Sequence, residues 1–275
     1  MRPNGPRGAL RKLNVSLAKR LNARLFNLGD TANRKVLWAD VGRRGARTDA
    51  VDCLRALLPR ALEVTARTVA GYFEELAASE LLQRSLDRYA TILEKARQPS
   101  LANVVTAENL FCYVATRCLK PSTVIETGCA TGWSSALFLL AMYHNQHGHL
   151  YSIDLPPVAG QLSMEWGLPP GLDVGFYVPE ELRSRWSLTL GNARMELIPL
   201  LERVGGVDIF RHDSDHTYVH MMWEYTAVWP YLALDGLLVS DDIGWNTAFW
   251  DFATAVGRPM VIHRSNTNFG VLSRS

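Results

Sequence analysis

The sequence lacks any hydrophobic run that could cross a membrane. Its longest apolar runs are only half as long as a membrane-spanning helix of about 20 residues. The first 30 residues are basic and have neither a continuous apolar core nor a small-residue cleavage site, so we expect no signal peptide. Cysteine is scarce as well, since four occur in 275 residues and none forms a C-x-x-C pair. We therefore expect a cytoplasmic protein with reduced thiols, without a disulfide framework or a zinc site.

Most of the chain lacks a net positive charge, although the formal net charge of the whole chain is +2. Residues 1–48 hold twelve Lys and Arg against two acidic residues, a balance of +10, whereas residues 49–275 hold 17 against 25, a balance of −8. An enzyme that acts on DNA or RNA usually carries its positive field around the active site. We therefore expect no nucleic-acid partner.

The basic N-terminal part divides from the rest by its pattern. Leucines recur at helical spacing and predict a basic amphipathic helix over residues 9–26, at Leu10, Leu13, Leu17, Leu21 and Leu25. This helix could contact an anionic membrane surface or resemble an organelle transit peptide. Packing against the body or a second subunit is the alternative that we favour. We expect an arm (residues 1–30), a helical cap or oligomerisation region (31–100) and an α/β domain (101–275), with a boundary near Pro99.

Residues 123–135, TVIETGCATGWSS, predict a buried strand, a glycine turn and a helix. In an open parallel sheet this corner binds ligands, because backbone N–H groups face the bound molecule. The G-x-G-x-x-G of dinucleotide folds is absent, since Ala130 and Trp133 stand where the second and third glycines belong. A pyrophosphate would be obstructed there by the Trp side chain. A nicotinamide-dependent oxidoreductase is therefore the less favoured hypothesis.

The turn offers instead an acidic residue followed by G-x-x-x-G, namely Glu126, Gly128 and Gly132. This pattern resembles motif I of the class I S-adenosylmethionine-dependent methyltransferases, and an ordinary tight turn is the alternative. Asp154 follows at the carboxyl end of the next predicted strand (149–154), where an acid can bind ribose hydroxyls. It could also simply cap a turn. In the methyltransferase interpretation, Asn192 lies beside the adenine.

Strand and helix patterns alternate from residue 123 and end in a hairpin. Strands are predicted at 123–125, 149–154, 187–190, 207–213, 236–241, 260–263 and 269–272. Helices are predicted at 50–97 in the N-terminal region, and then at 108–119, 131–144, 193–201, 217–231 and 245–255. We expect a Rossmann-like, seven-stranded, mostly parallel sheet with an N-terminal helical extension. The irregular residues 155–185 are expected to form a lid that contacts substrate.

Carboxylates gather after two of these strands. The strand 207–213 ends in Asp213, with Asp215 and His216 just beyond it. The strand 236–241 ends in Asp241, and Asp242 follows it directly. Both strand ends open at the same edge of a parallel sheet. Converging carboxylates resist ionisation unless a positive charge lies among them. Because all the ligands are oxygens, Mg²⁺ is the favoured cation.

Residues 121–255 are similar to metal-dependent O-methyltransferases of the macrocin and mycinamicin sugar type, which are related to catechol O-methyltransferases and the cephalosporin-biosynthesis group. The resemblance implies Mg²⁺ ligands at Asp213, Asp241 and Asp242. Its D-x-x-H spacing implies His216 as the general base, which acts together with Asp213. The Asp–Asp pair departs from the Asp–Asn of catechol-type enzymes, so a sugar hydroxyl is favoured as the methyl acceptor.

The resemblance thus implies an S-adenosylmethionine-dependent, Mg²⁺-assisted O-methyltransferase that acts on a glycosylated natural product, a sugar or a glycolipid. A non-catalytic membrane-surface protein on the same scaffold is a further alternative, suggested by the basic arm. Several residues also have structural interpretations. Asp215 can cap the next helix, His212 can be a core residue, and His216 and His220 are more simply surface histidines than a zinc pair.

Overall fold

A computed structural model of the chain describes residues 66–95, 107–155, 168, 172–258, 260–263 and 269–274. The parts of the prediction that lie outside these residues are the amphipathic helix 9–26, helical residues 50–65, the boundary at 98–100 and the turn at 265–268. None of the helices in the described residues is both long and apolar enough to cross a bilayer.

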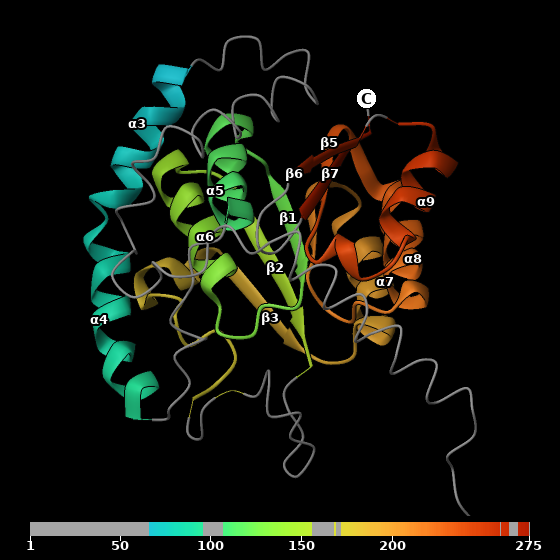
Figure 1. The fold of residues 1–275 in the computed structure, drawn as a ribbon. Coiled ribbons are helices and arrows are strands. Elements are labelled where there is room, and N and C mark those ends of the chain that lie inside the picture. Colours follow the sequence, from blue (N-terminus) through green and yellow to red (C-terminus); the bar gives the residue numbers. More distant parts are fainter. Residues whose placement is uncertain are drawn as a thin grey trace, which may run out of the picture. The chain divides into compact units, whose positions relative to one another are not determined.

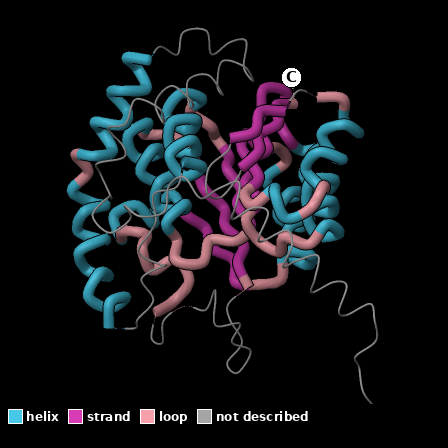
Figure 2. The backbone as a smooth tube through the Cα atoms, in the orientation of Figure 1, coloured by secondary structure: helices cyan, strands magenta, loops and turns pink. Residues whose placement is uncertain are grey.

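The described residues form the predicted seven-stranded sheet (Figures 1 and 2). The strands are β1 (Thr123–Thr127), β2 (His149–Asp154), β3 (Trp186–Leu190), β4 (Val207–His212), β5 (Leu232–Ser240), β6 (Met260–His263) and β7 (Phe269–Ser273). Their order is β3-β2-β1-β4-β5-β7-β6, and β7 runs antiparallel to both of its neighbours. The first five strands are parallel, so their carboxyl ends meet at one edge, which we call the carboxyl edge.

Helices cover both faces of this sheet, with α3 to α6 on one side and α7 to α9 on the other (Figure 1). The helices are α3 (Ala66–Ala77), α4 (Glu80–Lys95), α5 (Ala107–Leu119), α6 (Trp133–Asn145), α7 (Ala193–Val204), α8 (Tyr218–Val228) and α9 (Ala248–Val256). Short 3-10 helices occur at η3 (Glu180–Arg185), η4 (Trp229–Tyr231) and η5 (Ile243–Trp245). We call the two sides the α5 face and the α8 face.

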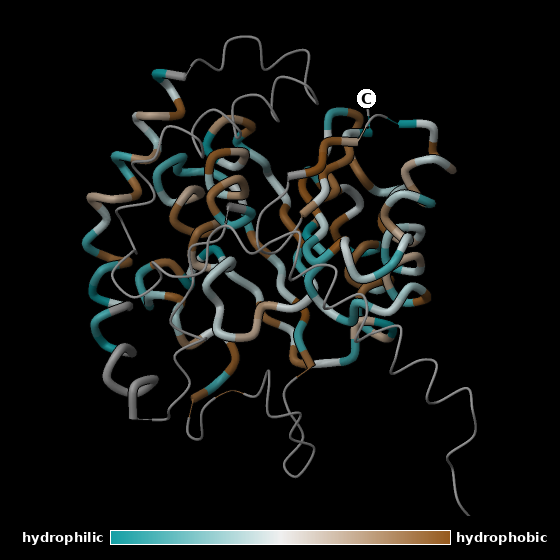
Figure 3. The backbone as a smooth tube through the Cα atoms, viewed as in Figure 1, coloured by the Kyte–Doolittle hydropathy of each residue, from teal (hydrophilic) through white to brown (hydrophobic). Residues whose placement is uncertain are grey.

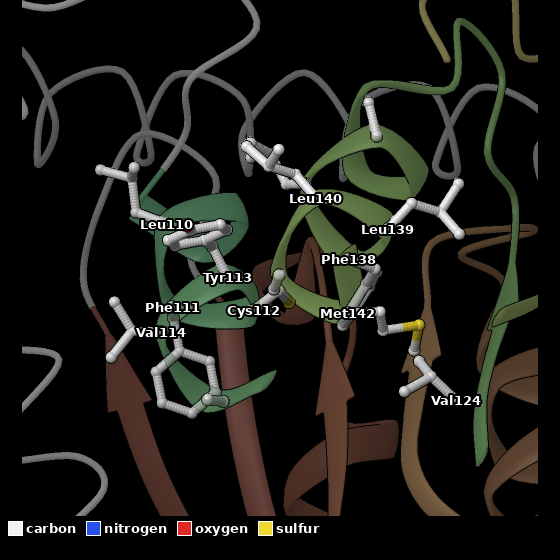
Figure 4. Close-up of a cluster of buried hydrophobic side chains, with 14 of the residues drawn as sticks. Leu110, Phe111, Cys112, Tyr113, Val114, Val124, Phe138, Leu139, Leu140 and Met142 are labelled. Atoms are coloured by element: carbon white, nitrogen blue, oxygen red, sulfur yellow. The ribbon is translucent and has the colours of Figure 1, made fainter. Parts of the chain in front are cut away.

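Alternation along the strands produces the two cores. Val124 and Ile209 pack on the α5 face, whereas the next residues, Ile125 and Phe210, pack on the α8 face. Side chains of α5 and α6 fill the space above Val124 (Figure 4). The hydropathy colouring shows hydrophobic stretches along α5 and along β5 and β7 (Figure 3).

Most predicted bounds are confirmed within a few residues, and two differences have a local cause. The helix predicted over 217–231 ends at Val228 and continues as η4, which contains Pro230, a residue without an N–H for the helix ladder. The helix predicted over 245–255 is divided into η5 and α9, because Asn246 between them is fully extended, with φ −158°.

The described part of the N-terminal region packs on the domain through the buried side chains of Val69, Phe73, Leu76 and Leu82, and also through polar contacts. Arg117 of α5 makes a bidentate pair with Glu75 of α3, at 2.7 and 2.9 Å, and Tyr113 donates to the same carboxylate at 2.5 Å. Ser85 of α4 donates to the carbonyl oxygen of Tyr177 at 2.6 Å. These helices are therefore fastened to the α5 face, and their role in oligomerisation stays a prediction.

Candidate active site

The glycine turn and the end of β4 lie in direct contact at the carboxyl edge. Gly128 has φ +79°, and a Cβ built on it would lie 2.0 Å from the carbonyl oxygen of Asp213. Its N–H donates to the carbonyl oxygen of Ile153 in β2 at 2.9 Å. The N–H of Asp213 donates to the carbonyl oxygen of Thr127 at 2.9 Å. Only glycine fits this position, because any side chain would separate the turn from β4.

Gly132 begins α6 with φ +82° and lies against another part of the chain. A Cβ on it would lie 2.5 Å from the Cα of Gly175. The segment 172–179 is hydrogen-bonded to the turn, since Gly175 N–H donates to Ala130 O at 2.8 Å and Tyr177 N–H to Thr131 O at 2.9 Å. This part of the predicted lid is therefore a fixed support of the turn, with Phe176 and Tyr177 buried. Residues 156–167 of the predicted lid lie outside the described residues.

Asp154 and Asn192 are brought to the same edge by β2 and β3. The Asp154 carboxylate accepts hydrogen bonds from the backbone N–H groups of Cys129 at 2.8 Å and Ala130 at 2.5 Å. A carboxylate has about four acceptor positions, so ribose hydroxyls can still bind to it. Asn192 caps α7, because its Oδ1 accepts from the N–H of Arg194 at 2.9 Å. Its side-chain NH₂ group is not needed for that cap.

Glu126, the predicted cofactor-binding acid, lies buried beneath the glycine turn, and its role toward a cofactor stays a prediction. Its side chain is 0% exposed, and its carboxylate accepts hydrogen bonds from Ser134 at 2.9 Å, Ser152 at 2.6 Å and also Ser135. Burial raises the pKa of Glu126, and Arg211 and the serine hydroxyls oppose that rise. The residue therefore holds the start of α6 on the sheet from below the turn.

The sequence interpretation missed Arg211, which is the centre of the site. It is the fifth residue of β4, and its side chain is only 3% exposed. Its Nε and Nη2 donate to the two carboxylate oxygens of Glu108 in α5, at 2.8 and 3.2 Å. Nη2 also donates to Asp213 at 2.7 Å, and Nη1 donates to the carbonyl oxygen of Gly128 at 3.3 Å. A positive charge supplied by the chain itself therefore lies among the carboxylates.

Asp213 and His216 are adjacent, as predicted. Oδ2 of Asp213 is held by Arg211, and its Oδ1 lies 3.4 Å from Nε2 of His216. Burial would raise the pKa of Asp213, but Arg211 and His216 outweigh it and hold that pKa below its ordinary value. Burial lowers the pKa of His216, but Asp213 outweighs it, so the pKa of His216 lies above its ordinary value.

Asp241 and Asp242 follow β5 at the same edge. Asp241 is 8% exposed, and its Oδ1 is buried without a hydrogen-bond partner among the described residues. Burial, with Glu108 and Asp213, raises the pKa of Asp241 well above its usual range. Burial also raises the pKa of Asp242, and His216 opposes that rise.

The predicted Mg²⁺ ligands do not form a metal site in this arrangement. Within the part of the chain that the structure describes, no three His, Cys, Asp or Glu side chains are placed to hold one ion. The reason lies at Asp213, whose two carboxylate oxygens face Arg211 and His216. The sequence predicted that these acids need a positive partner. Arg211, which the sequence analysis did not consider, supplies that positive charge at Asp213.

A second buried network lies on the α8 face. The Glu224 carboxylate is 0% exposed and contacts Thr127 at 2.6 Å, Ser214 at 2.9 Å, His212 at 2.6 Å and His220 at 2.8 Å. Burial would raise the pKa of Glu224, but the two histidines hold it well below its usual range. His212 is a core residue, as predicted. His220 is 7% exposed, so its interpretation as a surface histidine was wrong.

The residues after each acid have defined roles. Asp215 was expected to cap the next helix, but Thr217 is the N-cap of α8, and Asp215 instead holds the preceding turn, where its Oδ1 accepts from the N–H of Thr217 at 2.9 Å. Trp245 is 56% exposed, and its ring centroid lies 5.9 Å from that of His216. Asn246 donates to the carbonyl oxygen of His216 at 2.9 Å. An exposed aromatic ring thus lies next to the predicted base.

This strand order, with one antiparallel strand and a glycine turn after β1, is the Rossmann-like, seven-stranded, mostly parallel fold expected from the sequence. Residues 125–243 match a family model described as a methyltransferase domain. The matched segment runs from within β1 to the start of η5. No curated protein matches the chain.

Solved structures share the fold at low sequence identity. Cofactor-bound Rv0187 from MTB is 13% identical, with a TM-score of 0.52 over 76% of this chain and 97% of its own. The O-methyltransferase TomG from Streptomyces achromogenes, involved in tomaymycin synthesis and solved with S-adenosylmethionine, is 14% identical, with a TM-score of 0.50 over 71% and 89%. A Bacillus cereus O-methyltransferase in complex with S-adenosylhomocysteine is 9% identical, with a TM-score of 0.50 over 69% and 90%.

Proposed function

We propose that this protein is an S-adenosylmethionine-dependent O-methyltransferase that acts on a hydroxyl of a small molecule, such as a sugar, a glycosylated natural product or a glycolipid. The observation that carries the proposal is the turn after β1, whose backbone is held by Asp154 within the matched methyltransferase domain. The cofactor-bound relatives named above support it by their fold. No observation favours the oxidoreductase or the non-catalytic alternative.

The turn suits the predicted cofactor. Gly128 and Gly132 adopt positive φ and let the turn pack closely against Asp213 and Gly175, which fixes the course of its backbone. In the proposed complex Asp154 binds the ribose hydroxyls and Asn192 lies beside the adenine. The proposal is supported by the position of both residues after neighbouring parallel strands, at the edge that also carries the turn. Glu126 acts from below, by holding the start of α6.

When bound, S-adenosylmethionine supplies an electrophilic methyl group. In the proposed reaction His216 takes the proton of the acceptor hydroxyl at Nδ1, since Nε2 faces Asp213. Asp213 keeps the imidazole oriented and stabilises its charged form. Nδ1 is buried and has no hydrogen-bond partner among the described residues, so the acceptor has to reach it through a rearrangement of neighbouring side chains. No step is assigned to Mg²⁺, because the predicted ligands are not assembled.

The remaining parts of the prediction concern partners. A homo-oligomer and a peripheral membrane contact through residues 9–26 are retained as proposals, and that segment lies outside the described residues. Co-sedimentation with anionic vesicles, with and without residues 1–30, tests the membrane contact.

The direct test compares two carboxylates that make the same kind of contact at opposite ends of the sheet. Asp154 accepts from two successive backbone N–H groups at the carboxyl edge, and Asp208 accepts from those of Ser122 and Thr123 at the amino edge, at 2.7 and 2.9 Å. Calorimetric titration of S-adenosylhomocysteine should give micromolar binding to wild type and to Asp208→Ala. Binding to Asp154→Ala should be weaker by about 10-fold or more.

Methyl transfer from labelled S-adenosylmethionine to a panel of sugars, glycosides and phenols then tests the reaction. Binding of NAD in place of S-adenosylhomocysteine would overturn the proposal. Equal loss of binding in both variants would show that Asp154 acts only through stability.

A further inference from the structure

Resting on the proposed function, we propose that methyl transfer by this protein needs no divalent cation, because Arg211, fixed by Glu108, supplies the positive charge among the carboxylates. The family resemblance noted in the sequence analysis implied Mg²⁺ bound by Asp213, Asp241 and Asp242. The structure instead has a guanidinium in contact with one of the three predicted ligands.

The position of Arg211 is over-determined. Its side chain is 3% exposed, and each of its three nitrogens has an acceptor. Nε and Nη2 form a two-pronged pair with Glu108, Nη2 also reaches Asp213, and Nη1 reaches Gly128 O at 3.3 Å and Ser134 Oγ at 3.4 Å. A guanidinium stays protonated in proteins, so this charge is permanent.

Glu108 is what makes the buried arginine tolerable. Its own side chain is 1% exposed, and it comes from α5, on the face of the sheet that Arg211 occupies. An unpaired buried charge would cost several kcal/mol, on the order given for broken buried ion pairs. Through this ion pair, α5 holds the Arg211 side chain at the carboxyl edge.

A metal ion at the predicted place would compete with this arrangement. An ion bound by Asp213 would lie beside a cation that cannot lose its proton, in a region of low dielectric where like charges repel strongly. Asp213 would also have to give up or share its 2.7 Å contact with Arg211. Arg211 touches no reacting atom, so it is a positioning residue that keeps Asp213 ionised and directed at His216.

The first test uses the full-length protein and does not depend on a known acceptor. Metal content is measured by mass spectrometry after purification without added metal, and Mg²⁺ is titrated calorimetrically into the protein saturated with S-adenosylhomocysteine. We expect substoichiometric metal and no heat of binding at millimolar Mg²⁺. Stoichiometric metal, or saturable Mg²⁺ binding, would overturn the inference, whatever the protein methylates.

The second test uses variants. Arg211→Met removes the charge and leaves the carboxylates uncompensated, so we expect it to gain Mg²⁺ or Mn²⁺ affinity that wild type lacks. Arg211→Lys keeps a charge and should not gain it. Arg117→Met is the control, since it also removes an arginine that makes a bidentate pair, here with Glu75 of α3 and away from the three predicted ligands. No gain in Arg211→Met would argue against the substitution of a metal by Arg211. If that variant does not fold, the wild-type titration still decides.

Once an acceptor is found, turnover is compared in EDTA and in Mg²⁺. We expect the same kcat in both. A metal that contributes several kcal/mol to the transition state would instead appear as a loss of about 100-fold or more in EDTA. That loss would overturn the inference while leaving the proposed methyltransferase function intact. Absence of methyl transfer and of S-adenosylhomocysteine binding would overturn the function, and with it the inference that rests on it.

Discussion

Replacement of Gly128 by Ala is the most direct probe of how the site is built. Two costs can be estimated from the structure. The residue has φ +79°, a conformation that costs a side-chain-bearing residue about 1–2 kcal/mol. The added Cβ would also lie 2.0 Å from the carbonyl oxygen of Asp213 and 2.5 Å from its carbonyl carbon. Ordinary C···O contacts are about 3.3 Å, so one of the two backbones must move by about 1 Å.

Such overpacking costs about 1–3 kcal/mol, which brings the expected loss for Gly128→Ala to about 2–5 kcal/mol. Because the displaced segment carries Asp213 and the turn is the proposed cofactor site, affinity for S-adenosylhomocysteine should also fall. Urea unfolding followed by Trp fluorescence measures the first effect. Calorimetry under native conditions measures the second.

Gly205 provides the matched control. It ends α7 with φ +71°, and nothing lies within 4 Å of a Cβ built there. Gly205→Ala therefore carries the same conformational cost of about 1–2 kcal/mol without the overlap. The difference between the two variants isolates the contact between the turn and β4. Equal losses of stability, with unchanged cofactor affinity in both, would refute the reasoning.

Three further predictions concern the neighbours of this contact. Glu224→Gln should lower the free energy of unfolding at neutral pH by about 2–4 kcal/mol, because a buried charged acceptor is lost, whereas Glu202→Gln on the exposed surface of α7 should have little effect. Since the folded-state pKa of Glu224 is lowered from 4.5, this stabilisation is present above pH 4.5 and is lost as the pH falls below it. The difference in free energy of unfolding between wild type and Glu224→Gln, measured by urea unfolding, should therefore decrease in acid. An unchanged difference would contradict the assignment. The kcat/KM of wild type should rise with pH through a pKa above 6.5. Burial and Arg211 lower the pKa of His216, but Asp213 and Asp242 outweigh them. Asp213→Asn should therefore shift the rise in kcat/KM to lower pH, and it should also lower kcat. Trp245→Ala should raise the KM for the acceptor and leave the affinity for S-adenosylhomocysteine unchanged, and the opposite result would place Trp245 on the cofactor side.

The elements of the sheet could be predicted because their signals are local. β1 contains a β-branched run that leads into a glycine turn, β2 ends in an acid, and the structure gives β2 the bounds expected from sequence. Gly128 and Gly132 could be singled out because only a turn with positive φ explains them at that spacing. Such features need no knowledge of what packs against them.

Contacts between distant residues could not be predicted in the same way. Arg211 and Glu108 are 103 positions apart, so no spacing along the chain announces their pairing. The hydrogen bonds of Glu126 could not be predicted for a related reason. Its three serine partners include Ser152 from β2, and only the pairing of β1 with β2 brings that hydroxyl to it.

One signal in the sequence did point to these contacts. β4 reads VDIFRH, and its last two residues are ionisable although both lie fully inside a central strand. Successive side chains of a strand point to opposite faces, so Arg211 enters the α5 face and His212 the α8 face. Each then requires a partner from the helices on its own face, because a buried ionisable group without one is costly. Glu108 and Glu224 are those partners, and they hold from both sides the strand end that carries Asp213.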